Sequence, residues 1–403
     1  MRTVALPSLM LCIVFLQNVL SAATPEYAIE QQVISEGYDR TTCWVHLRGG
    51  FFPNGTAVFV TQKLTLTGSD VFDAIHSMES TDGGRTFSEP LEQPTLSRRQ
   101  REDGRILCPC DATPAWHKAS GTMLLIGHMA VYESKDEGKT LRLASQYRPG
   151  FFYAVYDETS KRFGKMKSVE FLPDSPLYNG SPGCVQRYDL ADGTILVPLS
   201  VRKNLSDPVR DTVVVRCSFD GKEIKPIDIG KPIFLSLPAG RGLYEPSVVG
   251  FDGKFFLTMR NDVKGYVSVS SDGLNYSEPI PWRWEDGEEI GNYNTQQHWV
   301  RGGGNLYLVY TRRAENNGHV FRHRAPLFIA QVDPQGPNLI RNTERIAVPE
   351  HGARLGNFGI THVNDQESWA TVTEWMQGPG GWLKCEEHGA NNRLWQSRFL
   401  WQK

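Results

Sequence analysis

The chain has 403 residues, of which 40% are hydrophobic and 22% charged, and its formal net charge at pH 7 is −2. A protein that binds nucleic acid through the phosphates normally carries a basic excess, so this balance argues against nucleic acid as a partner. The 38 glycines and 24 prolines favour a turn-rich β protein over a helical one.

The N-terminal residues have the features of a secretory signal peptide. Arg2 provides a positive charge, residues 4–19 form an apolar run, and Ser21, Ala22 and Ala23 form a small-residue cleavage site. We therefore expect residues 1–23 to be removed and the mature protein to be secreted or periplasmic. The alternative, an N-terminal membrane anchor, would require a longer apolar run, and no other segment of the sequence is a candidate membrane span.

Six cysteines remain after this segment, and an even number permits disulfides in an oxidising compartment. They are Cys43, Cys108, Cys110, Cys184, Cys217 and Cys385. The Cys108–Cys110 spacing is shorter than the Cys-x-x-Cys of zinc and redox sites. We expect neither a metal site nor a cofactor.

Short apolar and β-branched segments alternate with turn residues along the rest of the chain, and helical periodicity is almost absent. The clearest segments are residues 56–64, 121–133, 193–201, 211–219, 253–261, 265–271, 304–313, 325–333 and 368–375. Because no low-complexity linker divides them, we expect residues 24–403 to form a single, mostly antiparallel β domain.

A turn motif recurs between these segments. Residues 80–87 follow the pattern Ser-x-Asp-x-Gly-x-Thr-aromatic, in which Asp82 can accept backbone hydrogen bonds and Gly83 and Gly84 can adopt positive φ. Residues 134–141 repeat the pattern with Leu141 at the last position, and residues 270–276 and 218–224 are weaker copies. The motif resembles the Asp-box of the sialidase superfamily, which implies a structural role for Asp82 and not a catalytic one. The same holds for Asp136.

Repetition at this spacing is typical of β-propellers, in which about 40–50 residues form each four-stranded blade. The mature length then allows six to eight blades, and the sialidase resemblance implies six. We therefore expect an all-β, six-bladed propeller of four-stranded antiparallel blades. Its site should gather side chains from distant segments at the central axis.

Four stretches resemble sialidase segments in the same order along the chain. They are residues 44–55, 110–128, 180–199 and 243–261. The resemblance implies that Glu245 and Arg260 match a key Glu and one Arg of an arginine triad. Sialidases bind the sugar carboxylate with three Arg and use a Tyr nucleophile activated by a Glu, with an acidic group as acid/base.

The late segment 354–363 departs from this pattern. It has Asn357 and Phe358 where sialidases place the nucleophilic Tyr. Tyr244 and Tyr293 are candidate replacements, but strand alternation would point Tyr244 and its neighbour Glu245 to opposite faces. Another residue therefore takes the role, or the chemistry differs.

The candidate site combines catalytic groups with anion-binding groups. The catalytic candidates are Glu245 as base or nucleophile, and Asp111 or His46 as acid. The expected substrate-binding residues are Arg48, Arg260, Gln297, His298 and Arg322. The three arginines would bind a carboxylate or sulfate, since guanidinium groups pair with such anions in a bidentate way.

Three details of this assignment stay open in the sequence. Arg312, Arg313 and Arg324 are alternatives to Arg322 and lie in the same segment. His46 and Arg48 are expected to share one strand face. Glu374 is a further carboxyl whose burial would raise its pKa and suit it to act as an acid.

These residues predict a secreted, exo-acting glycoside hydrolase for an anionic glycan bearing sialic acid, uronate or sulfate. A polysaccharide lyase acting on uronates, with His as base, Tyr as acid and Arg as neutraliser, is an alternative. A glycan-binding propeller without activity is another, because a fold does not define a function.

Overall fold

The structure is a computed structural model that describes residues 27–66, 70–134, 140–144, 150–171, 175–177, 179–204, 207–236, 239–292 and 294–402. The signal peptide expected at residues 1–23 lies outside the described residues, as do Asp136 and Tyr293.

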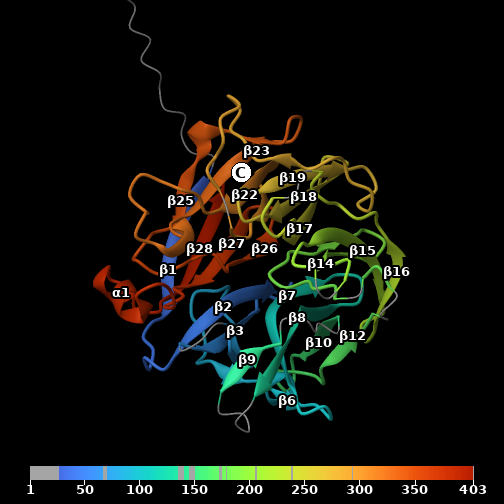
Figure 1. Cartoon of the computed structure of the whole chain (residues 1–403), viewed down its shortest axis with the longest axis vertical. Coiled ribbons are helices and arrows are strands. Elements are labelled where there is room, and N and C mark those ends of the chain that lie inside the picture. Colours follow the sequence, from blue (N-terminus) through green and yellow to red (C-terminus); the bar gives the residue numbers. More distant parts are fainter. Residues whose placement is uncertain are drawn as a thin grey trace, which may run out of the picture.

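Six β-sheets are formed by the described residues, and they follow one another around a ring in chain order (Figure 1). The first sheet contains β2 (Thr42–Phe51), β3 (Ala57–Thr65), β4 (Phe72–Ser80) and β5 (Leu91–Glu92). The second contains β6 (Arg99–Gln100), β7 (Ile106–His117), β8 (Thr122–Ser134), β9 (Leu141–Leu143), β10 (Phe151–Asp157), β11 (Arg162–Phe163) and β12 (Lys167–Val169). The third contains β13 (Tyr188–Asp189), β14 (Ile195–Val201), β15 (Asp211–Phe219) and β16 (Ile224–Ile229).

The second half of the ring has the same organisation. The fourth sheet contains β17 (Tyr244–Phe251), β18 (Lys254–Arg260), β19 (Tyr266–Ser270) and β20 (Ile280–Pro281). The fifth contains β21 (His298–Gly302), β22 (Asn305–Tyr310), β23 (Leu327–Asp333), β24 (Asn338–Leu339) and β25 (Arg345–Val348). The sixth contains β26 (Gly359–Asn364), β27 (Glu367–Thr373), β28 (Leu394–Trp401) and β1 (Tyr27–Ser35). The helical segments are α1 (Gly381–Glu387) and the 3₁₀ turns Pro94–Leu96, Phe321–His323 and Arg341–Thr343.

The prediction of an all-β, propeller-like arrangement is confirmed. Four sheets have the predicted four antiparallel strands, whereas the second has seven and the fifth five. The second sheet is larger because β8, with 13 residues, is long enough to pair with β10 through one part and with β9 through another.

The ring is closed by pairing the two ends of the described chain. β1 lies antiparallel to β28, from Tyr27 opposite Trp401 to Ser35 opposite Leu394. The sixth sheet therefore contains both the first and the last strand, so opening the ring requires breaking this pair.

The core lies between neighbouring sheets. Apolar side chains of β8 and β10 pack with those of β14 and β15, and those of β22 and β23 pack with the sixth sheet. β14 is buried along its whole length because both faces of its sheet are covered. All six cysteines of the described chain are buried and free, so no disulfide contributes there.

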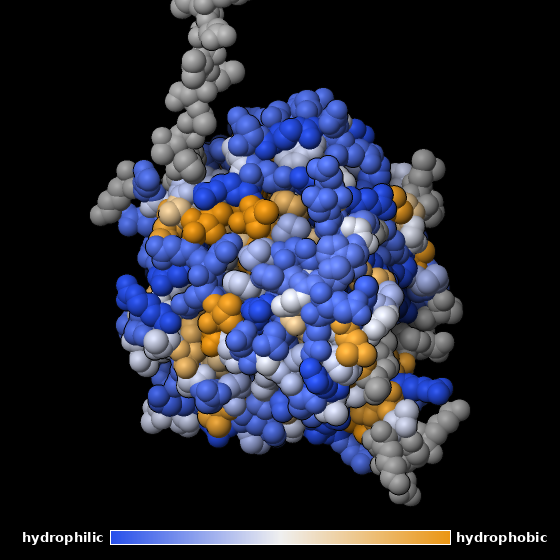
Figure 2. All heavy atoms as spheres, turned by 90° about the vertical axis from the view of Figure 1, so that its left-hand side faces the viewer, coloured by the Kyte–Doolittle hydropathy of each residue, from blue (hydrophilic) through white to orange (hydrophobic). Residues whose placement is uncertain are grey.

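The outer surface is mainly polar. The face in Figure 2 is largely hydrophilic, with several small and separate hydrophobic patches. No helix among the described residues is long and apolar enough to span a membrane.

The recurrent Asp turns hold the last hairpin of three sheets. Asp82, which follows β4, accepts hydrogen bonds from the backbone N–H groups of Arg85 and Thr86, both at 3.0 Å, and from the Thr86 hydroxyl at 2.6 Å. Asp272, which follows β19, and Asp220, which follows β15, cap their turns in the same way. These contacts support the structural role expected for Asp82.

Ionised carboxylates in these turns make stability depend on pH. Hydrogen bonds from Thr86 lower the pKa of Asp82, and hydrogen bonds from Asn275 lower the pKa of Asp272. A carboxylate whose folded pKa lies below its unfolded value of about 4 stabilises the fold above that pH and loses this contribution as the pH falls towards the folded pKa. The Asp82→Asn/Asp272→Asn double variant should therefore lose less unfolding free energy than the parent protein between about pH 7 and pH 3.

Urea unfolding followed by tryptophan fluorescence at both pH values measures this difference. Asp228→Asn is the matched control, because Asp228 is exposed and accepts one hydrogen bond from the adjacent N–H of Ile229. Equal acid sensitivity in the double variant and the parent would contradict the assignment.

Candidate active site

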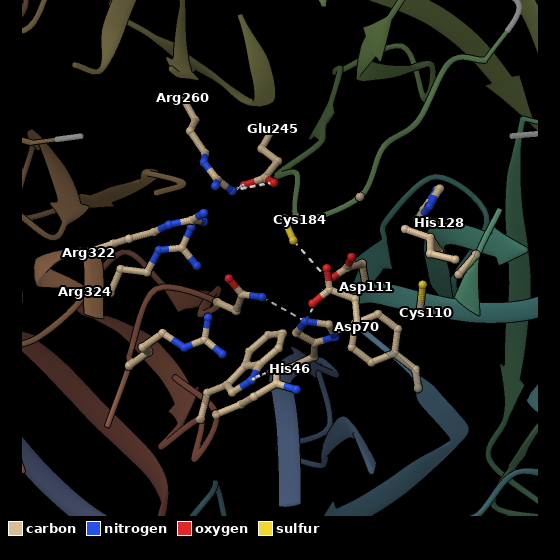
Figure 3. A pocket seen from close by; sticks show the side chains of 18 of the residues that line it. His46, Asp70, Cys110, Asp111, His128, Cys184, Glu245, Arg260, Arg322 and Arg324 are labelled. Atoms are coloured by element: carbon tan, nitrogen blue, oxygen red, sulfur yellow. Dashed lines mark hydrogen bonds and ion pairs between the residues drawn. The ribbon is translucent and has the colours of Figure 1, made fainter. Parts of the chain in front are cut away.

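A cavity of 640 Å³ receives side chains from segments of all six sheets. Its size is within the range of about 300–1,000 Å³ that is usual for ligand sites. Charged, polar and aromatic side chains line it, among them Asp70, Asp111, His46, His128, Cys184, Arg210, Arg241, Glu245, Arg260, Arg322, Arg324, Arg354, Asn357 and Trp375. Figure 3 shows Arg260, Arg322 and Arg324 on one side of the cavity and Asp111 and His128 on the other.

Backbone bulges turn three of these side chains into the cavity. His46, Asp111 and Glu245 lie where the pairing register shifts in β2, β7 and β17, and their φ angles are 59°, 52° and 47°. A bulged residue with positive φ leaves the regular alternation of the strand and re-aims its side chain. The same device, used in three sheets, brings an imidazole and two carboxylates to one cavity.

Asp111 contacts His46, the Cys184 thiol and, in a longer ion pair, Arg48. His46 Nε2 lies 2.9 Å and Arg48 Nη2 3.7 Å from its Oδ1 atom, and the Cys184 thiol donates to the same oxygen at 3.0 Å. Burial would raise the pKa of Asp111, but the charges of His46 and Arg48 and the hydrogen bonds outweigh it, and the pKa is lowered. The surroundings of Asp111 therefore favour its carboxylate form at neutral pH in the unliganded site.

Arg260 contacts the carboxylate of Glu245 and the aromatic ring of Tyr244. Its Nη1 donates to Glu245 Oε1 at 2.6 Å, its Nη2 donates to Asn294 Oδ1 at 2.6 Å, and its guanidinium lies 4.7 Å from the centre of the Tyr244 ring. Burial would lower the pKa of Arg260, but the Glu245 carboxylate raises it above the ordinary value. Glu245 and Arg260, matched by resemblance in the sequence, are thus direct partners.

Three further arginines bring positive charge that is not neutralised by pairing. Arg322, Arg324 and Arg354 form no ion pair with a carboxylate of the described chain. Burial, together with the charges of Arg260 and Arg354, lowers the pKa of Arg324 well below its usual value, and burial lowers that of Arg354 to about 10. Glu245 raises the pKa of Arg324 and Asp70 raises that of Arg354, but neither offsets burial, so an anionic ligand would stabilise both cations further.

The lining of the whole cavity also carries more positive than negative charge. Among the described lining residues there are six arginines and three carboxylates. Asp262, outside the lining, pairs with Arg241 at 2.7 Å, and an excess of positive charge still remains. The cavity therefore favours a ligand that carries negative charge.

Three residues expected at the mouth do not line the cavity. Arg48 is 1% exposed and donates to the Phe358 carbonyl at 3.3 Å, although it still reaches Asp111. Gln297 accepts a hydrogen bond from Thr258 at 2.7 Å and His298 lies 2.7 Å from Ser247, both buried. Burial and the charge of Arg48 lower the pKa of His298 to about 3, so it is neutral. Their place at the mouth is corrected, whereas His46, Asp111, Glu245, Arg260 and Arg322 do line it.

Among the described residues, no tyrosine takes the place of the expected nucleophile in the cavity, and the candidate Tyr293 lies outside the described part of the chain. Asn357 occupies the late position, with Nδ2 at 3.0 Å from His46 Nε2, and Phe358 is buried in the core. The Tyr244 hydroxyl is bound to Arg241 and Asp262, at 2.6 and 2.7 Å, behind Arg260. Among the described lining residues there is no tyrosine.

Sequence reasoning missed Arg354 and Cys184. Both lie inside stretches compared with sialidases, Arg354 three residues before Asn357 and Cys184 in residues 180–199. Glu374, proposed as an acid, does not line the cavity and is bound by Arg393 and by backbone N–H groups. Arg312 pairs with Glu344 at 2.6 Å and also lies outside the lining.

Comparisons with known proteins identify the fold. No protein-family model and no curated protein matches this chain. A protein of unknown function from Dyadobacter fermentans superposes with a TM-score of 0.62 at 14% identity, covering 94% of this chain and 100% of its own. Trypanosoma rangeli sialidase, solved with the inhibitor DANA, superposes at 0.57 and 13% identity over 89% of this chain and 55% of that chain. NanB sialidase from Streptococcus pneumoniae superposes at 0.60 and 11% identity over 92% of this chain and 70% of that chain.

At such low sequence identity, these superpositions establish a shared fold only. An activity has to be argued from the residues of the site. This chain spans about half the length of the trypanosomal enzyme. The shared fold and the propeller arrangement of the sheets agree with the resemblance seen in the sequence: the chain has the β-propeller fold of the sialidases.

Proposed function

We propose that the protein is an exo-acting glycoside hydrolase for an anionic glycan, with a terminal sugar that carries a carboxylate or sulfate. The observation that carries the proposal is the excess of guanidinium groups facing the Asp111–His46 pair across one cavity. The fold shared with sialidases supports the same class of reaction.

The arginines would bind and orient the acidic sugar. Arg322, Arg324 and Arg354 offer guanidinium groups without a carboxylate ion pair in the described chain, although Arg324 already donates to the Asn294 carbonyl. A guanidinium group pairs strongly with a carboxylate or sulfate. Arg260 holds the Glu245 carboxylate beside them through an ion pair, where the carboxylate can stabilise positive charge that develops on the sugar ring.

The Asp111 carboxylate would act as the base. With Asn357 in place of a tyrosine, water is the nucleophile in this proposal, and Asp111 takes a proton from it. The water oxygen bonds to the anomeric carbon, the bond to the leaving oxygen breaks, and that oxygen takes a proton from solvent water. Asp111 then releases its proton to solvent, so the number of protons balances. His46 and Arg48 keep Asp111 ionised and in place.

The proposed function includes a domain organisation and export from the cell. We take the six sheets as the six blades of one propeller domain spanning residues 24–403, exported by a signal peptide at residues 1–23. The mature N-terminus of the exported protein, read by mass spectrometry, tests this processing.

A panel of sialylated, uronate-containing and sulfated glycans tests the reaction. We expect release of a terminal acidic sugar from one class, without the ultraviolet absorbance of an unsaturated uronate. The methyl ester of a carboxylate substrate should react about 10- to 100-fold more slowly, because an ester forms no charged pair with the arginines. An unsaturated product would indicate the lyase, and binding without turnover would indicate a non-catalytic glycan-binding protein.

A further inference from the structure

We propose that a second cavity beside the first is a subsite for a second acidic sugar, so that the preferred ligand has two adjacent anionic sugars. The cleavage of such a ligand rests on the proposed function, but its binding does not. The second cavity has a volume of 260 Å³ and lies between the segment around Phe321 and α1.

The two cavities are adjacent, because they share part of their lining. The shared residues are Phe321, Arg322, Arg354, Gln377, Gly378 and Pro379. Arg322 and Arg354 therefore stand at the boundary, where the link between two sugars would lie.

The second cavity is also lined by basic side chains. It adds His319, His323 and Lys384 to the two boundary arginines, and no carboxylate is among its described lining residues. Glu350 contacts His319 at 2.8 Å and Glu387 contacts Lys384 at 2.6 Å from outside the lining. Among the described residues, the positive charge at this cavity that forms no ion pair is therefore that of the boundary arginines Arg322 and Arg354.

An aromatic ring supports the boundary arginines. The Phe321 ring centre lies 4.8 Å from the Arg322 guanidinium and 5.3 Å from that of Arg354. The opposite side of Arg354 packs on Trp375 at 4.6 Å, and its buried Nε has no hydrogen-bond partner among the described residues. Rings beside fixed cations suit an acidic sugar, because a ring packs on the C–H face while the cations bind the acid.

The backbone at the boundary is held in an unusual conformation. Arg322 and His323 have φ angles of 58° and 49°, which costs energy for residues other than glycine. Asn317 stabilises this segment by donating to the carbonyls of Arg312 and Ala325, both at 2.8 Å. The strained conformation places Arg322 so that it lines both cavities.

Gly318 provides a variant that blocks only the second cavity. It lines that cavity and not the first, and a Cβ atom added there meets no atom within 4 Å. Gly318→Trp should fill the space without disturbing the fold. Gly336→Trp is the matched control, because Gly336 lines neither cavity and a Cβ atom added there makes only ordinary van der Waals contacts, at 3.6 Å with Asn338 Nδ2 and at 4.0 Å with Asp333 Oδ2. Lys384→Gln removes one charge at an exposed position.

The experiment compares binding of one and two acidic sugars by calorimetry. The probes are sialic acid with disialic acid and galacturonic acid with digalacturonic acid, with the catalytically silent Asp111→Asn protein used to prevent turnover. For the acid that binds, we expect the dimer to bind at least about tenfold more tightly than the monomer. Gly318→Trp in this background should abolish that preference, Lys384→Gln should reduce it, and Gly336→Trp should retain it, all without changing monomer binding.

Each result separates this inference from the proposed function. Equal affinity for dimer and monomer, or a dimer preference that survives Gly318→Trp, would overturn the second subsite even if the enzyme hydrolyses its glycan. A preference that Gly318→Trp removes would support the subsite even if the protein with Asp111 intact cleaves nothing. Weaker monomer binding in Gly318→Trp would place the blocked space in the first site and also overturn the inference.

Discussion

Asp111→Asn is expected to lower kcat/KM by about 100- to 10,000-fold, with little change in KM. The amide has nearly the same shape and can still accept a hydrogen bond from His46, which lies 2.9 Å from the carboxylate. It cannot take a proton from water. Steady-state kinetics on the glycan identified by the panel measure the loss, and circular dichroism checks the fold.

Asp70→Asn is the matched control for this variant. Asp70 lines the same cavity, but among the described residues His46 and Arg48 form their ion pairs with Asp111 and not with Asp70. Loss of one negative charge alone should change KM more than kcat. If both variants lose kcat equally, the effect of Asp111 is electrostatic and its role as base is wrong.

Glu374→Ala is expected to lower the free energy of unfolding by about 3 kcal/mol. The side chain is 1% exposed, and it accepts hydrogen bonds from the N–H groups of Asn391 and Arg393, at 2.9 and 3.1 Å, and from the Trp395 indole at 3.3 Å. Removing it leaves these donors buried without an acceptor. It also removes an ion pair of 3.3 Å with Arg393, and so detaches the end of β27 from the start of β28.

Glu374→Gln is the conservative control, since it keeps one oxygen acceptor and should cost less. Chemical denaturation of the three proteins gives the free energies, and kcat should be unchanged under conditions where all are folded. A Glu374→Ala protein that unfolds like the parent but has lost kcat would instead make Glu374 a catalytic residue.

Local sequence chemistry was sufficient for the turns and the strands. An Asp followed by Gly and Thr satisfies its own backbone N–H groups within a few residues, so the turn at Asp82 forms from its own sequence. The apolar strands were readable for the same reason, since β14 is buried on both faces and needs an uninterrupted apolar run. The extra strands of the second sheet could not be predicted in this way. For example, β9 has only three residues and forms only by pairing with the C-terminal end of β8.

For the site, the sequence by itself determined the residue types and several positions: Glu245 with Arg260, Asp111 and the missing tyrosine at Asn357. Only the tertiary structure decided which side chains line the cavity. The bulge in β2 sends His46 into it while Arg48 stays buried below, and Arg354 joins Arg322 and Arg324 there. The reason is physical: a bulge depends on how two strands pair, and the cavity depends on how six sheets close, and neither is encoded by neighbouring residues alone.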